Sequence, residues 1–453
     1  MSNWSPILRT GAAPRYLQLA DAIADAVTAN QLSAGDRLPP QRQLADRLGI
    51  DFTTVSRGYA EARRRGLVTS HVGRGTYIAQ AGANDGTPDL RRTSDVDLTM
   101  NLPPEPDDPA LIARMEDGLK VVSANLINLL RYQSSTGGQE DKEAASSWLS
   151  LRGMVPSLDR IAVTPGAHTT ILAILMRLAV PGDCLLCEQV TYSGFRGIAA
   201  RLGLKLIGLP GDADGIDPEA LENAIRAYGP KALYLNPTLH NPTTRTIPLH
   251  RRQAIAEVIT RHRLPLIEDD AYGFIPPNPP APLATLAPDL VWHIGGLAKC
   301  IGAGLRLAYT VAPNNRALLD LAQHLKSVSV MASPISMALA TRWIMDGTAD
   351  SIRRFIRVEM AERQRIAATA LAPFDFDADP YAFNLWLRLP EGRTRADVIG
   401  RMGGAGIGLM PSDVFTVSGE PTETLRVCLG GQIGRERLSD KLGLLALILS
   451  NDI

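Results

Sequence analysis

The first 80 residues show three short helical patterns followed by two β-prone runs. In YLQLADAIADAVTANQL the apolar positions recur at the spacing of one helix face, at Leu17, Ala20, Ile23, Ala24 and Val27. LPPQRQLADRLGI starts with a proline pair and ends near a glycine, as short helices do, and DFTTVSRGYAEARRRG carries a third apolar stripe. LVTSHVGRGTYIA then predicts two strands around a glycine-containing turn. Together these segments predict a winged helix-turn-helix domain over residues 1–79.

A different rhythm begins near residue 160. Short apolar runs alternate with longer helical stretches, and the runs are CLLCE, KLIGL, ALYLNP, LPLIEDD, LVWHIGG and LRLAYTVA. Such alternation predicts an α/β domain with a mainly parallel sheet, helices on both faces and a ligand site at the carboxyl ends of the strands. From about residue 335, long amphipathic helices and short strands predict a smaller α+β part.

Residues 80–96 separate the two regions. Their Gly, Asn, Asp, Thr and Pro residues show no periodicity, which predicts a linker. We therefore expect a first domain over 1–79 and a second over 97–453. The second would divide into a large part at about 145–330 and a small part at about 335–453, which includes the N-terminal segment.

Composition restricts the class of protein. Of 453 residues, 45% are hydrophobic and 21% charged, a globular balance that excludes a disordered or fibrous chain. No apolar run reaches the roughly 18 residues that span a bilayer, and MSNWSPILRT lacks the apolar core of a signal peptide. We expect a cytoplasmic protein with no membrane partner. Cys184 and Cys187 form a C-x-x-C, but CLLCE is typical of a buried strand, so we expect no metal.

Charge is distributed unevenly along the chain. Residues 1–80 contain ten Arg and six Asp or Glu, whereas the remainder has 37 basic and 41 acidic residues. The basic N-terminal region is compatible with binding a polyanion, and equally with an Arg-rich solvated surface. The helical pattern favours DNA, since it predicts a third helix able to enter the major groove and a wing able to reach an adjacent groove.

Several polar residues fall where the predicted strands of the larger region end. Lys299 lies in the apolar, glycine-rich stretch WHIGGLAKCIGAGLRLAY, where a lysine either extends to solvent or reacts. Asp269 ends LPLIEDD, and Tyr272 follows three residues later. An acid and a phenol so spaced can hold a pyridinium nitrogen and a neighbouring oxygen, although such an Asp can also cap a helix. Asn241 follows ALYLNP, and TPGAHTT places Ala167 at a helix N-terminus suited to phosphate.

The N-terminal motifs resemble the winged-helix domain of GntR-type bacterial regulators over its whole length. The resemblance rests on LPPQRQLADRLGI, TTVSRGYAEARRRGLV and GRGTYI, in that order. It implies contacts with double-stranded operator DNA from Arg42, Thr53, Thr54, Ser56, Arg57 and Arg74. Asp51 and Phe52 depart from the usual pattern at the start of the third helix. Asp51 could accept from a cytosine amine or cap the helix, and Phe52 could pack on a thymine methyl.

Residues 97–450 resemble fold-type I pyridoxal-phosphate enzymes, the aspartate aminotransferase superfamily. The resemblance implies that Lys299 forms the Schiff base with pyridoxal 5′-phosphate and is the catalytic residue. It also implies a cofactor site made of Asp269, Tyr272, Asn241, Tyr192, Ala167, His168, Arg306 and Tyr132. Tyr132 would reach the site of a partner subunit, which implies a homodimer, and Arg426 in ETLRVCLGG would bind the carboxylate of an effector. Gly296 and Ala298 depart from the pattern, since serines commonly precede the lysine.

A winged helix ahead of an aminotransferase-like domain resembles MocR-type regulators of the GntR family. The implied function is transcription regulation, in which the cofactor or its adduct with a small amine or amino acid shifts the balance between two dimer arrangements. An active aminotransferase with a vestigial head is the alternative, and a cofactor-free DNA-binding dimer is a third possibility. The sequence leaves open whether any turnover remains.

Overall fold

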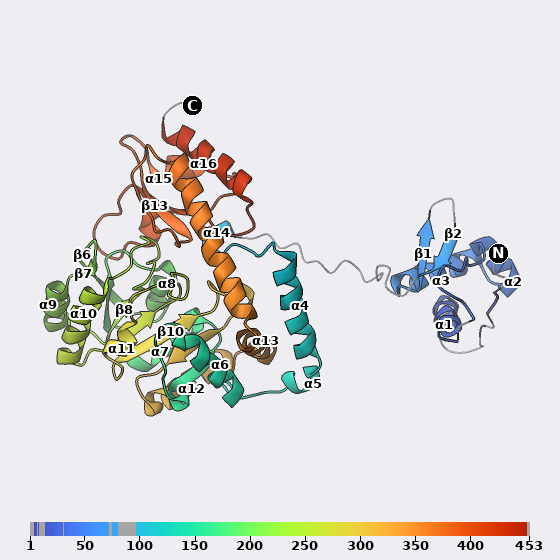
Figure 1. The fold of residues 1–453 in the computed structure, drawn as a ribbon, viewed down its shortest axis with the longest axis horizontal. Helices are drawn as coiled ribbons and strands as arrows, with labels where there is room; N and C mark the ends of the chain where they lie inside the picture. The colour runs from blue at the N-terminus through green and yellow to red at the C-terminus, as the bar shows by residue number, and fades with distance from the viewer. Residues whose placement is uncertain are drawn as a thin grey trace. The chain divides into compact units, whose positions relative to one another are not determined.

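The computed structural model describes residues 4–6, 8, 14–29, 31–71, 75–79 and 97–450 (Figure 1). The chain divides into two compact units, Met1–Asp95 and Val96–Ile453. We call the described part of the first unit the head and that of the second the body. The predicted linker over 80–96 lies outside the described residues.

The head contains three helices and a two-stranded antiparallel sheet within its described residues. They are α1 Arg15–Thr28, α2 Gln41–Leu48, α3 Phe52–Arg64, β1 Val68–His71 and β2 Gly75–Ile78. Pro40 precedes α2, and Gly49 ends it with a left-handed φ of 61°. The Asp51 carboxylate accepts from the backbone N–H of Thr53 at 2.7 Å, so of the two predicted roles the structure shows the cap.

The core of the head lies between α1 and α3. The buried positions of α1 are Leu19, Ala20, Ile23 and Ala26, so the predicted stripe is right at Ala20 and Ile23, while Leu17, Ala24 and Val27 are only half-buried. The contact with Gly58 explains why α1 turns a somewhat different face to the core than the one predicted. A Cβ on Gly58 would meet the Leu19 side chain at 2.7 Å, so α1 packs directly on the backbone of α3 through Leu19.

Seven strands among the body's described residues form one sheet in the order β3-β11-β10-β9-β8-β4-β5. Their bounds are β3 Ile161–Thr164, β4 Cys184–Glu188, β5 Lys205–Leu209, β8 Ala232–Leu235, β9 Leu266–Asp269, β10 Val291–Gly296 and β11 Ala308–Val311. Neighbours are parallel except at β11, which is antiparallel to β10 and β3. The connection from β10 to β11 is too short for a helical crossover, which explains the reversal.

Helices cover both faces of this sheet (Figure 1). On one face, α7 (Ala167–Leu178), α8 (Ser193–Arg201) and α12 (Asn315–Ser329) share a core with the sheet. On the other face lie α6 Gln139–Ser150, α9 Pro218–Tyr228, α10 Leu249–His262 and α11 Leu283–Leu286. Successive strand residues belong to opposite cores, as Leu266 and Ile267 do, because side chains alternate along a strand. Most of these strands therefore carry apolar side chains on both faces, and their charged residues lie mainly near the strand ends.

A smaller antiparallel sheet forms the C-terminal part of the body, in the order β12-β13-β15-β14. Its elements and flanking helices are α13 Pro334–Met345, α14 Thr348–Ala370, β12 Phe376–Asp377, β13 Asn384–Arg388, α15 Arg395–Arg401, β14 Leu409–Pro411, β15 Thr424–Cys428 and α16 Arg435–Leu449. The start of the body, η1 (Leu98–Met100), runs beside this sheet. A Cβ at Gly430 would stand 1.6 Å from the Leu102 carbonyl oxygen, so glycine permits the close approach.

The remaining elements connect these parts. They are α4 Pro109–Ser123, α5 Leu126–Leu129, η2 Leu158–Arg160, β6 Gly211–Asp212, β7 Gly215–Ile216, η3 Ala303–Leu305 and η4 Ser412–Val414. Within the described ranges, no helix combines the length and the hydropathy needed to cross a bilayer.

Candidate functional site

A cavity of about 500 Å³ opens at the carboxyl ends of the parallel strands, where the alternating pattern predicts a ligand site. Its volume is typical of small-molecule sites. Residues from both parts of the body line it. They are Thr99, Met100, Gly166, Ala167, His168, Tyr192, Ser193, Gly194, Asn236, Asn241, Asp269, Ala271, Tyr272, Gly296, Ala298, Lys299, Arg306, Leu307, Met410 and Arg426.

Lys299 lies just beyond β10 and extends into the cavity. Its Nζ donates to the carbonyl oxygens of Met100 at 3.1 Å and Asn101 at 2.7 Å. Burial, and after it the positive charge of Arg426, lowers the pKa of the Lys299 amine to about 8. At pH 7 about a tenth of this amine is therefore neutral and nucleophilic.

Asp269 ends β9, and its carboxylate is buried. Oδ2 accepts from the Tyr234 hydroxyl at 2.8 Å, whereas Oδ1 has no hydrogen-bond partner among the described residues. Burial raises the pKa of Asp269 to about 6, and the Tyr234 hydrogen bond opposes that rise. One carboxylate oxygen is thus held in place, and the other is available to a cationic donor in the cavity.

Arg426 projects from β15 and is buried. Its guanidinium donates to Asn241 Oδ1 at 2.8 Å, to Met410 Sδ at 3.0 Å and to the Thr99 carbonyl. Arg426 Nε has no partner among the described residues. Tyr272 accepts from Asn101 Nδ2 at 2.9 Å, and burial raises the pKa of its phenol. The neutral phenol and the fixed cation face the same cavity.

A second part of the cavity lining suits an anion. Gly166 precedes α7, whose first residues Ala167 and His168 line the cavity with free helix-terminal N–H groups pointing outward. Arg306, in the left-handed region with φ of 52°, lies nearby, since a Cβ on Gly166 would stand 3.4 Å from Arg306 Nη2. Burial, followed by the charge of Arg306, lowers the pKa of His168. Helix dipole and guanidinium together favour negative charge there.

The structure separates one predicted residue from the others. Tyr132 is 86% exposed and does not line the cavity, so its predicted role depends on a second subunit. Gly296 and Ala298 do line the cavity and offer it no hydroxyl groups. Cys184 and Cys187 both lie on β4, where residues three apart point to opposite faces, so the two thiols do not form a pair.

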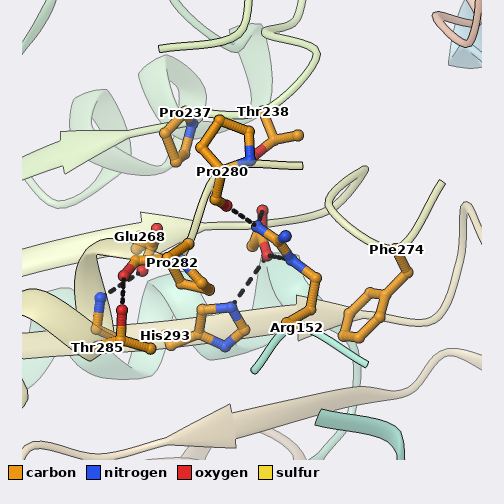
Figure 2. Close-up of polar contacts among 12 residues, drawn as sticks. Arg152, Pro237, Thr238, Glu268, Phe274, Pro280, Pro282, Thr285 and His293 are labelled. Atoms are coloured by element: carbon orange, nitrogen blue, oxygen red, sulfur yellow. Dashed lines mark hydrogen bonds and ion pairs between the residues drawn. The ribbon is translucent and has the colours of Figure 1, made fainter. Parts of the chain in front are cut away.

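A buried ionic network joins Arg152 and His293 to Asp270, the residue that follows Asp269 (Figure 2). Arg152 donates from Nε to Asp270 at 2.8 Å and from Nη2 to the Pro280 carbonyl at 3.2 Å, and His293 contacts the same Asp270 carboxylate at 3.2 Å. Burial opposes ionisation of Asp270, but the charge of Arg152 and the contact with His293 outweigh it and lower the pKa. The network fixes the residue that follows Asp269 and so orients the end of β9.

Sequence reasoning missed two groups of residues at this site. Tyr234 and Asn236 lie at the end of β8, and Asn236 donates to the Asp269 carbonyl and accepts from the Asn241 N–H. The rule that polar residues at strand ends face the ligand could have identified Asn236 beside Asn241. Thr99 and Met100 follow an aperiodic segment, and no sequence signal indicates that their carbonyls face Lys299 and Arg426.

The head presents the predicted DNA-contacting residues on and beside α3. Arg42, Thr53 and Arg57 are exposed, and Thr54 and Ser56 are half-buried. The guanidinium of Arg42 lies over the Phe52 ring at 5.8 Å, and that of Arg57 lies over Tyr16 at 4.4 Å. These contacts orient two cations near the N-terminal half of α3. Arg74 lies outside the described residues.

The cavity fits pyridoxal phosphate by its own chemistry. The unpartnered Asp269 oxygen complements a protonated ring nitrogen, the N-terminus of α7 with Arg306 complements a phosphate, and Lys299 provides an amine of lowered pKa. No group of His, Cys, Asp or Glu side chains in the described part of the chain is arranged to hold a metal ion.

Fold and site define an aminotransferase-like α/β domain that follows a winged-helix domain. The chain belongs to the aminotransferase class I and II family, whose model matches residues 94–432. Residues 15–78 match the bacterial regulatory proteins of the gntR family. These matches confirm the predicted fold class and the predicted MocR-type combination of domains.

The chain is similar to bacterial transcriptional regulators over most of its length. The chain is 26% identical over 452 residues to the uncharacterized HTH-type transcriptional regulator YdeF of Bacillus subtilis, covering 99% of this chain and 97% of that protein. It is 27% identical over 380 residues to the vitamin B6 salvage pathway transcriptional repressor PtsJ of Salmonella typhimurium, covering 82% of this chain and 85% of that protein.

A solved structure shares the fold of the body. LysN, the α-aminoadipate aminotransferase of Thermus thermophilus, has a TM-score of 0.70 at 21% identity and covers 78% of this chain and 92% of its own. At this identity the likeness establishes the fold alone.

Proposed function

We propose that this chain is a transcriptional regulator that binds operator DNA through its head and uses pyridoxal phosphate in its body to detect a small amine or amino acid. The observation that carries the proposal is the convergence of Lys299, Asp269 and Arg426 on one cavity in a chain whose head is a gntR-type winged helix. Such a regulator acts on the chromosome, so we also propose a cytoplasmic location.

Each side chain has a separate task in this proposal. Asp269 holds the ring nitrogen in its protonated form, and Tyr192 packs on the ring. Ala167, His168 and Arg306 hold the phosphate through helix-terminal N–H groups and positive charge. When bound, the cofactor supplies an aldehyde that condenses reversibly with amines.

Selection of the effector depends on the remaining polar residues. Lys299 binds the cofactor aldehyde through its neutral amine. Tyr272 and Asn241 hydrogen-bond the oxygen on the cofactor ring, and Arg426 binds the effector's carboxylate in bidentate geometry. Asn241 already accepts from Arg426, so the ring-binding and carboxylate-binding residues are directly connected. Closure of the small part on the effector would then alter the arrangement of two heads.

We also propose a homodimer. Large apolar side chains remain exposed along α4, α5 and the residues after them, namely Leu119, Val121, Leu126, Ile127, Leu130 and Tyr132. A contiguous exposed apolar surface typically marks a contact with another chain. A second copy covering it would place Tyr132 near the partner subunit's cavity and would bring two heads to one operator.

Replacement of Lys299 by alanine tests the proposal. Lys299→Ala should keep operator binding and lose the response to amino acids, because its head is intact and its amine is absent. The control is Lys326→Ala on α12, an exposed lysine. Binding is measured by gel shift on the DNA upstream of the gene, and cofactor attachment by borohydride reduction and peptide mass.

Two outcomes would contradict the proposal. A full amino-acid response in Lys299→Ala, or no cofactor on Lys299 after reduction, would remove the detecting site. An active aminotransferase with a vestigial head is not favoured, because a relative similar over nearly the whole chain is a transcriptional regulator. Many equivalents of keto acid per subunit without salt-sensitive DNA binding would revive it.

A further inference from the structure

The chain of the body begins directly over the cavity. Residues 97–102, which we call the strap, contain η1 and follow residues 80–96 without interruption. Thr99 and Met100 of the strap line the cavity together with Lys299 and Arg426. The first described residues of the body therefore lie at the proposed effector site.

Backbone oxygens of the strap accept hydrogen bonds from Lys299 and Arg426. The Thr99 carbonyl accepts from Arg426 Nη2, and the Met100 and Asn101 carbonyls accept from Lys299 Nζ at 3.1 and 2.7 Å. The carbonyl oxygens of the strap thus occupy positions that the proposed function assigns to the carboxylate and the amine of the effector.

Polar contacts hold the strap in this position. The Asp97 carboxylate accepts from the Thr99 N–H at 2.9 Å and from the Thr99 hydroxyl at 2.6 Å. Asn101 is left-handed, with φ of 51°, and its Nδ2 donates to Tyr272 at 2.9 Å and to Asn384 at 3.1 Å. Met100 is exposed and Leu98 is half-buried, so neither apolar side chain of η1 is fully buried beside these polar contacts.

A carboxylate is a stronger acceptor for Arg426 than a backbone carbonyl. The carbonyl is neutral and engages only Nη2, whereas a carboxylate is charged and matches the guanidinium with two parallel bonds. Arg426 Nε is buried without a partner among the described residues, so the guanidinium retains an unused donor. An effector with an acid group would therefore compete with Thr99 for Arg426.

We propose that the strap is a self-ligand of the effector site. The effector's carboxylate displaces the Thr99 carbonyl from Arg426, and the strap then loses its hydrogen bonds to the cavity residues and shifts from its place over the cavity. This inference rests on the proposed function, because it takes the cavity to be the effector site. It specifies that the effector is an amino acid and not a simple amine.

Two stable probes separate these possibilities. Phosphopyridoxyl-L-alanine carries a carboxylate, and phosphopyridoxyl-ethylamine is the matched compound without one. Binding of each is measured by calorimetry on the full chain, and exchange of the Thr99 and Met100 amides by hydrogen-exchange mass spectrometry. Since a hydrogen bond to a charged group contributes about 1.5–3 kcal/mol, we expect exchange about tenfold faster or more with the carboxylate probe. Phosphopyridoxyl-ethylamine should change it less than about twofold.

The outcomes distinguish this inference from the proposed function. If both probes bind and neither changes exchange in the strap, or both change it equally, the self-ligand inference is wrong and the effector site stands. If neither probe binds, the proposed function fails, and the inference fails with it.

Variants of Asp97 provide a second test. Asp97→Ala removes the cap of η1, weakens the strap as a competitor and should tighten binding of the carboxylate probe about threefold to tenfold. Asp97→Asn keeps a capping oxygen and removes the charge near Arg426, so it should change binding little. Asp108→Ala removes the equivalent cap of α4, a 2.9 Å contact with the Ala110 N–H, and is the matched control.

Each variant has a contradicting result. Weaker binding in Asp97→Ala would show that the strap helps to hold the ligand. Equal gains in Asp97→Asn would assign the effect to charge, and equal gains in Asp108→Ala would assign it to general loosening of the body. Any of the three would overturn the self-ligand inference.

Discussion

At the scale of single residues, the chemistry of Lys299 depends on its neighbours. Burial and the charge of Arg426 lower the pKa of its amine to about 8. Because the neutral amine attacks an aldehyde, cofactor capture should accelerate as pH rises through about 8 and level off above it. At pH 7 the rate should be about a tenth of the plateau, since one pH unit changes the neutral fraction about tenfold.

Arg426→Gln tests the cause of that profile. The charge of Arg426 lowers the Lys299 pKa most after burial. Its loss should therefore raise that pKa and move the midpoint of the rate profile to higher pH. Stopped-flow absorbance between pH 6 and 10 after mixing with pyridoxal phosphate measures both profiles, and Lys326→Ala is the control. A wild-type rate that is flat from pH 7 to 9.5 would contradict the lowered pKa.

Tyr234 controls the charge of Asp269. Its hydrogen bond favours the ionised carboxylate, whose pKa burial has raised to about 6. Tyr234→Phe should raise that pKa further, so the carboxyl would be partly protonated at pH 7 and ionised at pH 9. We expect cofactor affinity to fall about tenfold at pH 7 and less at pH 9, because one hydrogen bond to a charged group is lost.

Equilibrium titration with pyridoxal phosphate at both pH values measures this difference. Tyr309→Phe removes another buried phenol in the same sheet and is the control. An equal loss of affinity at the two pH values would show that Tyr234 acts through packing on Phe195, whose ring is stacked 3.9 Å away, and not through the Asp269 charge.

Residue chemistry was predictable where a motif and a strand end coincide. Lys299, Asp269 and Asn241 were identified from such positions, and Arg306 from the resemblance to aminotransferases; all four line the cavity. Tyr234 was missed because its role depends on a neighbouring strand, and β8 and β9 are joined by sheet pairing and not by sequence spacing. The strap was missed because its ligands are backbone carbonyls, which every residue has.

At the scale of elements, apolar runs predicted β4, β5, β8, β9, β10 and β11, because strands buried on both faces are continuously apolar. The antiparallel direction of β11 could not be inferred from composition, since direction depends on the length and path of the connection. The face of α1 was only partly predicted, because the close approach to Gly58 selects Leu19.

The exposed surface of α5 should hold the dimer together. Ile127 and Leu130 are 70% and 67% exposed, and burial of each by a second copy would contribute about 1.5–3 kcal/mol. Ile127→Asp combined with Leu130→Asp should therefore weaken dimerisation about 100-fold or more. Sedimentation equilibrium measures the change, and Val358→Asp, at a 63% exposed position of α14, is the control. An unchanged dimer would place the interface elsewhere.

At the scale of the whole molecule, the proposal requires the body to act on DNA binding through geometry. In this proposal each head contacts its half-site with its own α3, whereas the cavity belongs to the body, so an effector should leave the chemistry of one half-site unchanged. It should alter how well two heads fit two half-sites at once. Coupling of 1–3 kcal/mol, typical of allosteric proteins, corresponds to about 5-fold to 150-fold in affinity.

Fluorescence anisotropy at one salt concentration measures this difference on two duplexes, one with both half-sites and one with a single half-site. Phosphopyridoxyl-L-alanine should change affinity for the first by about tenfold and for the second by less than about twofold. In the double variant Ile127→Asp and Leu130→Asp, the ligand should no longer change affinity for the duplex with two half-sites, because the heads of that variant bind independently. An equal change on both duplexes would mean that the ligand alters the DNA-contacting surface of the head itself, and the geometric account would be wrong.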